Sequence, residues 1–523
     1  MDMLTDRAKL FLLGIAALLP LLGIAVLLWR RFYREDTGNT ARRVVKNSAL
    51  PIAANLVNKV IDFGFAAITL RYLGVAGNGA YSFIALIVGL YFLTISNWGL
   101  NDLTVREVAA DHGAAPRLFS VTLILRWGIA LLLMPAGAAL VGLYAAIGNP
   151  LSASAVTALA LLMLHLFPAA LAAAASASFQ AFQRMEVPAL VSLLTNIAKV
   201  FVGVAALELA SDVDSRVVAL AAVALGVTLL NAAIFFGLQQ RLLFRFRPSW
   251  DWPTGRSLLR QSFPLLLNSL LLVVFFRFDY VILRAFGDDR ALGAYDAAYK
   301  WINMTTIIPA YFVAALFPVL ARYAATDRPA LVRAYRHAFA LLQMIAWPAA
   351  VAVTVLSQEL ILLLGGRDYL PGAATALAIL IWFLPFSYAN GVTQYVLIAL
   401  RRQGGITVAF GIAAIFNLAA NLALIPLFGY AAAAALTIAT EVAIMLPFLR
   451  ILRQEQAALP FLALCWRPAL AALAMGAAML AAYRAAPLAA AAVAPVAYAA
   501  ALWALGAFGA EERALFRRVL GRA

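Results

Sequence analysis

Long apolar runs recur along the whole chain, and their length limits what it can fold into. Most hold about 20 residues, enough for an α-helix to cross the hydrocarbon core of a bilayer. In lipid, backbone polar groups are satisfied only in helices and closed barrels, and runs this long are typical of helices. The sequence therefore predicts about fifteen transmembrane helices, at residues 10–29, 48–70, 80–100, 118–146, 153–177, 188–208, 217–239, 262–284, 296–320, 337–364, 372–399, 405–426, 430–449, 468–484 and 487–508.

The composition leaves no room for a soluble catalytic domain. Hydrophobic residues make up 65% of the 523 residues, and charged residues only 12%. Soluble domains average about 45–50% apolar and about 25% charged residues, so this chain could not cover its surface with polar groups in water. We therefore expect an all-α membrane protein.

The basic residues are distributed asymmetrically about the predicted helices. When the segment before residue 48 is placed in the cytoplasm, 21 of the loop and tail arginines lie on that side and 6 on the opposite side. This is the positive-inside pattern, so the net charge of +16 does not indicate nucleic-acid binding. We predict a multi-pass protein of the cytoplasmic (inner) membrane that contacts membrane lipid and binds no nucleic acid.

The first predicted helix, residues 10–29, is interpreted as a retained span. It ends in Arg30-Arg31 and lacks the small-residue cleavage pattern of a secretory signal. Its basic end should stay in the cytoplasm, which predicts an N-terminus on the outer side.

Two halves of the chain share an ordered set of short motifs at an offset of about 213 residues. The first half has Pro51, Asn55, Arg71-Tyr-Leu-Gly74 and Gly79-Ala80-Tyr81, and the second has Pro264, Asn268, Arg284-Ala-Phe-Gly287 and Gly293-Ala294-Tyr295. Both sets begin on the same side of the membrane, so the repeat is parallel. Internal repeats are typical of transporters, whose substrate site lies at the repeat interface.

The repeat and the longer polar stretches define the predicted domains. These are an N-terminal helix with a basic linker (1–40), an N-lobe of six helices (41–240), a basic cytoplasmic linker (241–260), a C-lobe of six helices (261–450), and two C-terminal helices with a basic tail (451–523).

The predicted helix at 48–70 carries three polar residues on one face. Asn55, Lys59 and Asp62 are spaced by four and three residues, which aligns them on a helix. A charge at the bilayer centre costs about 2.5–3.5 kcal/mol on insertion scales, so such residues are functional candidates. They predict either the wall of a polar cavity or a Lys59–Asp62 pair that neutralises itself.

The predicted helix at 262–284 carries a corresponding set. Asn268 and Asp279 are eleven residues apart and share a helical face, whereas Arg277 lies on another face, deep in the span. Several cations facing one cavity would hold an anionic substrate, for which phosphate or pyrophosphate is the natural partner.

Several further ionisable residues lie within predicted spans, and four of them are considered next. Glu441 is in mid-span, and Lys300 is about one turn inside its helix, from where its amine could also extend to the interface. Arg126 and Arg284 lie near span ends, and we expect both to extend to the membrane surface. The candidate substrate-binding residues are Lys59, Arg277, Lys300, Asn55 and Asn268, and the candidate carriers of a coupling proton or sodium ion are Asp62, Asp279 and Glu441.

Motifs for nucleotide or metal chemistry are missing from the sequence. None of the five lysines follows a glycine, so there is no Walker A loop. His112, His165 and His337 have no metal-ligand spacing, and Cys465 is the single cysteine. We expect a transporter rather than an enzyme, without cofactor, metal or catalytic residues.

Several motifs together resemble the polysaccharide flippases of the Wzx type, within the multidrug/oligosaccharidyl-lipid/polysaccharide exporter superfamily. They are Asn47-Ser48 through Arg71-Tyr-Leu-Gly74, Gly79-Ala80-Tyr81, Gly99-Leu100, Arg106-Glu107-Val108-Ala109, Phe278-Asp279-Tyr280-Val281-Ile282-Leu283, Ala297-Ala298-Tyr299-Lys300 and Asn421-Leu-Ala-Leu-Ile-Pro426 through Glu441. The resemblance covers about residues 41–510. The extra helix at 10–29 departs from the fourteen-helix plan of these relatives.

The resemblance implies two six-helix pseudo-symmetric lobes in a V, with two added C-terminal helices. It also implies alternating access and a flippase for polyprenyl-pyrophosphate-linked oligosaccharides, in which Lys59, Arg277 and Lys300 would meet pyrophosphate or acidic sugars. Two alternatives remain. A drug or cation antiporter of the same fold would favour an acidic cavity, and a membrane glycan polymerase or transferase would carry a large outer loop or a metal-bound acidic pair.

Overall fold

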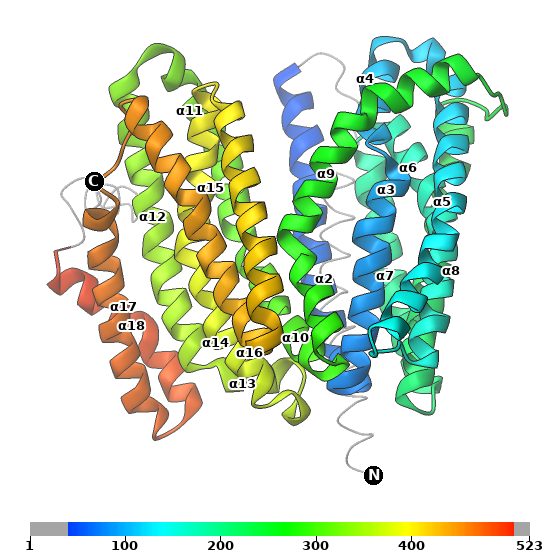
Figure 1. Cartoon of the computed structure of the whole chain (residues 1–523). Coiled ribbons are helices and arrows are strands. Elements are labelled where there is room, and N and C mark those ends of the chain that lie inside the picture. Colours follow the sequence, from blue (N-terminus) through cyan, green and yellow to red (C-terminus); the bar gives the residue numbers. More distant parts are fainter. Residues whose placement is uncertain (1–39, 507–523) are drawn as a thin grey trace. The chain divides into compact units, whose positions relative to one another are not determined.

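The chain is almost entirely helical. The computed structural model describes residues 40–506, and none of these forms a strand. The predicted helix at 10–29 and the tail beyond residue 506 lie outside the described residues. The all-α membrane fold is confirmed for the described part of the chain (Figure 1).

The helices follow the predicted spans closely. In chain order they are α2 (Thr40–Leu86), α3 (Leu93–Asn97), α4 (Leu100–Ala110), α5 (Ala115–Ala146), α6 (Ala153–Ala181), α7 (Glu186–Leu209), α8 (Val213–Leu242), α9 (Trp252–Phe286), α10 (Asp289–Thr305), α11 (Ile307–Thr326), α12 (Arg328–Val355), α13 (Ser357–Leu364), α14 (Gly372–Leu380), α15 (Leu384–Ala399), α16 (Gln403–Gln454), α17 (Phe461–Tyr483) and α18 (Pro487–Ala504). A π-helical stretch, Ile87–Phe92, links α2 to α3.

Twelve described segments are long and apolar enough to cross a membrane, and two of them are each too long for one crossing. Pro51–Asn97 has 47 residues and α16 has 52, which straight helices would extend to about 70 and 78 Å, against a hydrocarbon core of about 30 Å. The helical conformation is interrupted at Gly74 (φ 65°) in the first segment and at Gly429 (φ 59°) in the second. Residues with a Cβ avoid these positive φ angles. Each segment therefore contains two spans. Twelve segments, two of them divided, give the fourteen spans predicted after residue 48.

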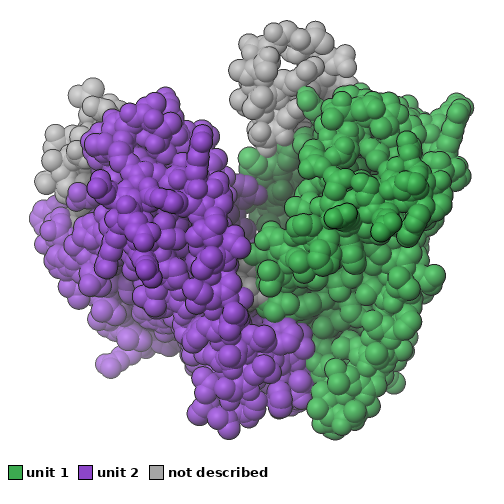
Figure 2. All heavy atoms as spheres, turned by 45° about the horizontal axis from the view of Figure 1, so that its top comes forward, with its two compact units in different colours: residues 1–276 green, residues 277–523 purple. Residues whose placement is uncertain are grey.

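The structure divides into two compact units, Met1–Phe276 and Arg277–Ala523 (Figure 2). The division falls inside α9, beyond the predicted linker at 241–260. The linker belongs to the first unit because it is bonded to that unit: the Ser249 amide donates to Ser120 Oγ at 2.8 Å, and the Trp98 indole donates to the Leu259 carbonyl at 3.2 Å.

Small residues let the helices of the first unit pack closely. Helix α6 packs extensively on α8, and its Ala174 and Ala175 are fully buried. Helix α7 packs on α2, where Gly203 faces Phe65, and a Cβ on this glycine would lie 2.6 Å from the Phe65 ring. Close contact through small residues is the usual way in which helices associate in lipid. It sets the spacing of α2 and α7, which hold the polar site described below.

In the second unit, α12 is the central packing partner. It packs on α15 and on α17, and α17 pairs closely with α18. The contact includes Val351 of α12 and Met475 and Met479 of α17, all buried. The two C-terminal helices are thus part of the second unit.

The prediction that Arg126 and Arg284 reach the membrane surface is wrong. Arg126 is fully buried, and its guanidinium donates to Asn101 Oδ1 at 2.7 Å. Arg284 is 2% exposed and pairs with the Asp289 carboxylate at 2.7 Å. Neighbouring helices α4 and α10 supply these polar partners, so each guanidinium group has a polar contact inside the protein and does not extend to the interface.

Candidate functional site

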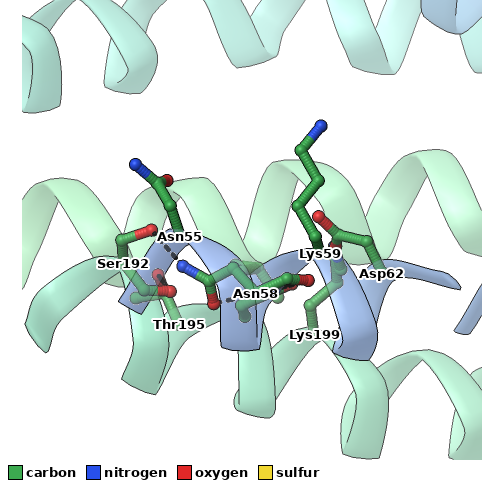
Figure 3. Close-up of a pocket in the computed structure, with 9 residues that line it drawn as sticks. Asn55, Asn58, Lys59, Asp62, Ser192, Thr195 and Lys199 are labelled. Atoms are coloured by element: carbon green, nitrogen blue, oxygen red, sulfur yellow. Dashed lines mark hydrogen bonds and ion pairs between the residues drawn. The ribbon is translucent and has the colours of Figure 1, made fainter. Parts of the chain in front are cut away.

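A polar pocket of about 320 Å³ lies within the first unit, between α2, α7 and α8 (Figure 3). Eight of its nine lining residues are polar or charged, and the full set is Asn55, Asn58, Lys59, Asp62, Ser192, Thr195, Asn196, Lys199 and Val227. We call this set the unit-1 pocket. The pocket lies along membrane-spanning helices, where polar groups are costly unless they serve a cavity or each other.

The spacing of polar residues along two helices creates the pocket. On α2 the predicted residues Asn55, Lys59 and Asp62 do lie together, as their spacing of four and three requires. On α7, polar residues recur at positions 192, 195, 196 and 199, which is the same helical period. The two polar faces meet where the helices pack.

Asn58 joins the two helices by hydrogen bonds. Its side-chain amide donates to Ser192 Oγ at 3.0 Å, and its carbonyl oxygen accepts from the Asn196 amide at 3.0 Å. Asn58 is only 9% exposed, whereas Asn55 is exposed at the pocket and makes no hydrogen bond within the described residues. Asn58 is therefore a structural link, and Asn55 has an amide that is available to a ligand.

The charges in the pocket leave one cation without a counter-ion. Lys199 pairs with Asp62 at 2.6 Å and lies 5.6 Å from the centre of the Phe65 ring. The predicted alternative, a Lys59–Asp62 pair, is not formed, because α7 supplies the partner of Asp62. Lys59 is exposed and has no ion pair among residues 40–506, and Figure 3 shows its side chain extended away from the Asn58–Ser192 contact. Lys59, Lys199 and Asp62 give the pocket a net charge of +1.

A second polar cluster lies within the second unit, around Arg277 of α9. Its guanidinium donates to Asn303 Oδ1 at 3.1 Å and to the Tyr280 hydroxyl at 3.3 Å, and it stacks 4.3 Å above the Tyr299 ring. These contacts hold a half-buried arginine in one orientation without giving it a carboxylate partner.

Carboxylates complete this second cluster. The Tyr280 hydroxyl donates to Asp296 at 3.3 Å, and Lys300 pairs with the same carboxylate at 3.0 Å. Asp279 is 5% exposed and accepts a hydrogen bond from the Tyr295 hydroxyl at 2.6 Å. Arg277 and Lys300 thus share one network, in which two cations face two carboxylates. We call this network the unit-2 cluster.

Glu441 of α16 lies in a separate polar contact in the second unit. The Asn390 side-chain amide donates both to the Glu441 carboxylate, at 2.7 Å, and to its backbone carbonyl, at 2.8 Å. Thr440, the residue before Glu441, accepts from Asn417 at 2.8 Å, and Asn421 donates to Asn417 at 2.9 Å. These polar contacts join the two halves of α16 next to Glu441.

The predicted site residues are divided between the two units. Asn55, Lys59 and Asp62 lie in the unit-1 pocket, and Asn268 lies exposed on α9 in the same unit. The second unit holds Arg277, Asp279, Lys300 and Glu441. Sequence reasoning missed Asn58, Ser192, Thr195 and the tyrosines around Arg277. The polar period on α7 could have identified Ser192 and Thr195, but no sequence signal distinguishes these tyrosines from core residues.

The described residues hold no group of three or more histidine, cysteine, aspartate or glutamate side chains that could bind a metal ion. The arrangement can instead bind an anion through Lys59 and hydroxyl-rich groups through amides and hydroxyls.

Comparison with known proteins gives one sequence family that covers more than half of the chain. The family described as polysaccharide biosynthesis protein matches residues 44–324, and the MatE family matches residues 264–423. No curated protein sequence matches the chain.

Solved structures of transporters share the fold. The chain is similar to the lipid II flippase MurJ in an inward closed conformation, with a TM-score of 0.69 and 14% identity, over 91% of this chain and all of that one. It is also similar to an inward-facing multidrug resistance MATE family transporter of the MOP superfamily, with a TM-score of 0.62 and 15% identity, over 76% of this chain and 95% of that one. A mutant of the Vibrio cholerae MATE transporter VcmN gives a TM-score of 0.50 at 16% identity, over 80% and 98%. The chain therefore belongs to the polysaccharide biosynthesis protein family and has the flippase and transporter fold of the MOP superfamily.

Proposed function

We propose that this protein moves an oligosaccharide linked to polyprenyl pyrophosphate across the cytoplasmic membrane by alternating access. The family is one of polysaccharide biosynthesis, and the fold is shared with a flippase of lipid-linked substrate. One observation carries the proposal: a membrane-embedded pocket that is lined by amides and hydroxyls and has an unpaired lysine.

The physical need for such a pocket is clear. A charged sugar head group cannot cross hydrocarbon unaided, because each unsatisfied polar group in lipid costs several kcal/mol. The amides and hydroxyls of the unit-1 pocket would replace water around sugar hydroxyls. Lys59 would bind a phosphate oxygen with a charge-assisted hydrogen bond. The net charge of +1 disfavours the alternative of a cationic drug.

The unit-2 cluster is the second proposed contact for the head group. Within residues 40–506, Arg277 has no carboxylate in hydrogen-bonding contact, and Tyr299 and Asn303 fix its plane. A fixed guanidinium is suited to bidentate phosphate binding. Lys300 and Asn268 are proposed as supporting contacts to the same substrate.

Three carboxylates are proposed to couple transport to a proton or sodium ion. Asp62 lines the unit-1 pocket, and Asp279 and Glu441 lie inside the second unit with hydrogen-bonding partners. Ionisable groups within membrane spans commonly serve as proton or ion relays.

The test is a flipping assay in proteoliposomes with a panel of polyprenyl-pyrophosphate-linked glycans. We expect transport by the wild type, a loss of about tenfold in Lys59→Gln, since a hydrogen bond to a charged group contributes about 1.5–3 kcal/mol, and substantial recovery in Lys59→Arg. The recovered lipid should be chemically unchanged by mass spectrometry, which separates transport from polymerase or transferase activity. No movement of any glycan by the wild type, or export of a cationic drug that survives Lys59→Gln, would overturn the proposal.

A further inference from the structure

The segment between α8 and α9 combines exposed arginines and tryptophans at the end of two membrane spans. Helix α8 ends at Leu242 and α9 begins at Trp252, and the residues between them form no strand and almost no helix. We call residues 241–260, which include the ends of both helices, the interfacial strap. Because it connects two candidate spans, we expect the strap to lie near the depth of the lipid head groups.

The strap is fixed to the first unit. Phe244 and Phe246 pack edge-on against Phe119, with ring centroids 5.9 and 5.6 Å apart. At the other end, Asp251 forms an ion pair with Arg117 of α5. The Phe246 amide also donates to Gln240 Oε1 at 2.8 Å. The strap therefore has an inner face, which packs on the first unit through Phe244 and Phe246, and an outer face, which points away from that unit.

The outer face is basic and aromatic. Side chains alternate along an extended chain, so the inward positions of Phe244 and Phe246 turn Arg245 and Arg247 outward, and both are exposed. Trp250 and Trp252 are 49% and 58% exposed, and their rings lie 5.9 Å apart. Tryptophan side chains with this exposure at a span end are typical of the membrane interface.

The arginines of the strap have no counter-ions. Arg241, Arg245, Arg247, Arg256 and Arg260 are all exposed, and none forms an ion pair with any of residues 40–506. Asp251 is the single acidic residue of the strap and is already paired with Arg117. The strap therefore carries five exposed positive charges that the described residues do not neutralise, two of them, Arg245 and Arg247, on its outer face.

We propose that the interfacial strap is a binding surface for anionic phospholipid head groups. Exposed guanidinium groups match phosphate geometry, and clusters of four to eight basic residues beside a transmembrane helix attract anionic lipids. The paired tryptophans would hold the strap at head-group depth while the arginines select lipids by charge. The positive-inside pattern assigns this surface to the cytoplasmic leaflet.

The test measures quenching of Trp250 and Trp252 by brominated lipid in nanodiscs that contain the full chain. Their contribution to the fluorescence is the difference in emission between the wild type and the Trp250→Phe/Trp252→Phe variant. At equal mole fraction, we expect brominated phosphatidylglycerol to quench this contribution about twofold more than brominated phosphatidylcholine. High salt should reduce the difference, because the screening length falls to about 3 Å near 1 M.

Charge variants identify which arginines cause the preference for phosphatidylglycerol. Arg245→Gln/Arg247→Gln should reduce quenching by phosphatidylglycerol to the level of phosphatidylcholine. The matched control, Arg450→Gln/Arg453→Gln, removes two exposed arginines without ion pairs at the end of α16, and should preserve the preference. Equal quenching by both lipids, or a preference that survives Arg245→Gln/Arg247→Gln, would overturn the proposal. So would the absence of quenching by either lipid, which would mean that the tryptophans of the strap do not contact the bilayer.

Discussion

The pairing of Lys199 with Asp62 decides how much positive charge the unit-1 pocket presents. The carboxylate neutralises one of the two lysines, so Lys59 alone is left to meet an anion. Lys199 and Asp62 are 31% and 49% exposed, so solvent screens their interaction and its energy is modest. The pair therefore adjusts the charge of the pocket without contributing much to stability.

Asp62→Asn should strengthen binding of the pyrophosphate head group. It leaves Lys199 uncompensated and raises the net charge of the pocket from +1 to +2. We expect substrate affinity to rise about two- to fivefold, in line with roughly 0.5–1 kcal/mol for a screened charge, as measured by substrate binding to detergent-solubilised protein. Lys199→Gln is the opposing control: Asp62 then becomes available to Lys59, and affinity should fall. Unchanged affinity in both variants would show that the head group does not enter this pocket.

Two asparagines on α2 should respond differently to substitution. Asn58→Ala removes a buried group that bonds both Ser192 and Asn196, and we expect a loss of about 1–3 kcal/mol of unfolding free energy. Asn55→Ala removes an exposed amide, so it should leave the midpoint of thermal unfolding unchanged and weaken substrate binding. Equal losses of stability in the two variants would contradict these assigned roles.

At the scale of residues, the sequence predicted that Asn55, Lys59 and Asp62 share one helical face, but it could not predict their partners. The spacing of Asn55, Lys59 and Asp62 requires a common face. The choice between a Lys59–Asp62 and a Lys199–Asp62 pair depends on how α7 packs on α2, which the sequence does not encode locally. Arg126 and Arg284 were misassigned for the same reason, because their partners lie on other helices or in the adjoining turn.

At the scale of elements, glycines allow the chain to reverse between spans. Gly74 has φ 65° and ψ −178°, and Gly429 has φ 59° and ψ −141°, both in regions open almost solely to glycine. The apolar pattern predicted a boundary near each of them, because the two spans that meet there are each of membrane length. The short helices α3 and α13 were absorbed into the predicted spans 80–100 and 337–364, and α4 fell in the predicted loop between 80–100 and 118–146.

Alanine at these positions should destabilise the protein through backbone strain. Gly74→Ala and Gly429→Ala should each cost about 1–3 kcal/mol, which would be observed as a lower midpoint of thermal unfolding in detergent. Gly64→Ala is the matched control, because Gly64 is helical within α2 and a Cβ there meets nothing within 4 Å. That variant should be neutral or more stable by up to about 1 kcal/mol. A Gly74→Ala protein as stable as Gly64→Ala would contradict the role given to the turn.

Glu455 connects both ends of α16 and the start of α12 through charge. It follows α16 and accepts hydrogen bonds from Arg328, which begins α12, and from Arg402, which precedes α16. Burial alone would raise the pKa of Glu455, but the hydrogen bonds and charges of Arg402 and Arg328 outweigh burial and hold the pKa below its usual value. A lowered pKa in the folded state means that these bonds stabilise the fold above the unfolded pKa of about 4.3.

Stability should therefore fall as the pH drops from about 4.3 through the lower folded pKa of Glu455. The Glu455→Gln variant should be less stable than the wild type at neutral pH and should lose less on acidification, so that the two unfolding midpoints converge. Parallel pH profiles of the two proteins would contradict the assignment. Asp368, which lies in the loop before α14 and forms none of these bonds, supplies the control variant Asp368→Asn.

At the scale of the whole molecule, the two units hold the proposed contacts separately. Lys59 belongs to the first unit and Arg277 to the second, and the alternating-access proposal requires both to act on one pyrophosphate during the cycle. The repeat predicted two halves, whereas the division inside α9 could not be predicted, because it follows from how the strap bonds to the first unit.

A double-mutant cycle on Lys59 and Arg277 tests this requirement directly. Residues that act on separate ligands or steps change the transport free energy additively, whereas residues that share a ligand are coupled by about 0.5–3 kcal/mol. We therefore expect the loss of transport of lipid-linked glycan in Lys59→Gln/Arg277→Gln to be smaller than the product of the two single losses. The reason is that either substitution alone already removes one of the two contacts that hold the pyrophosphate. The control cycle pairs Lys59→Gln with Arg453→Gln and should be additive. Additivity in both cycles would mean that the two units never hold the same head group, and would leave the unit-1 pocket without a partner site in the second unit.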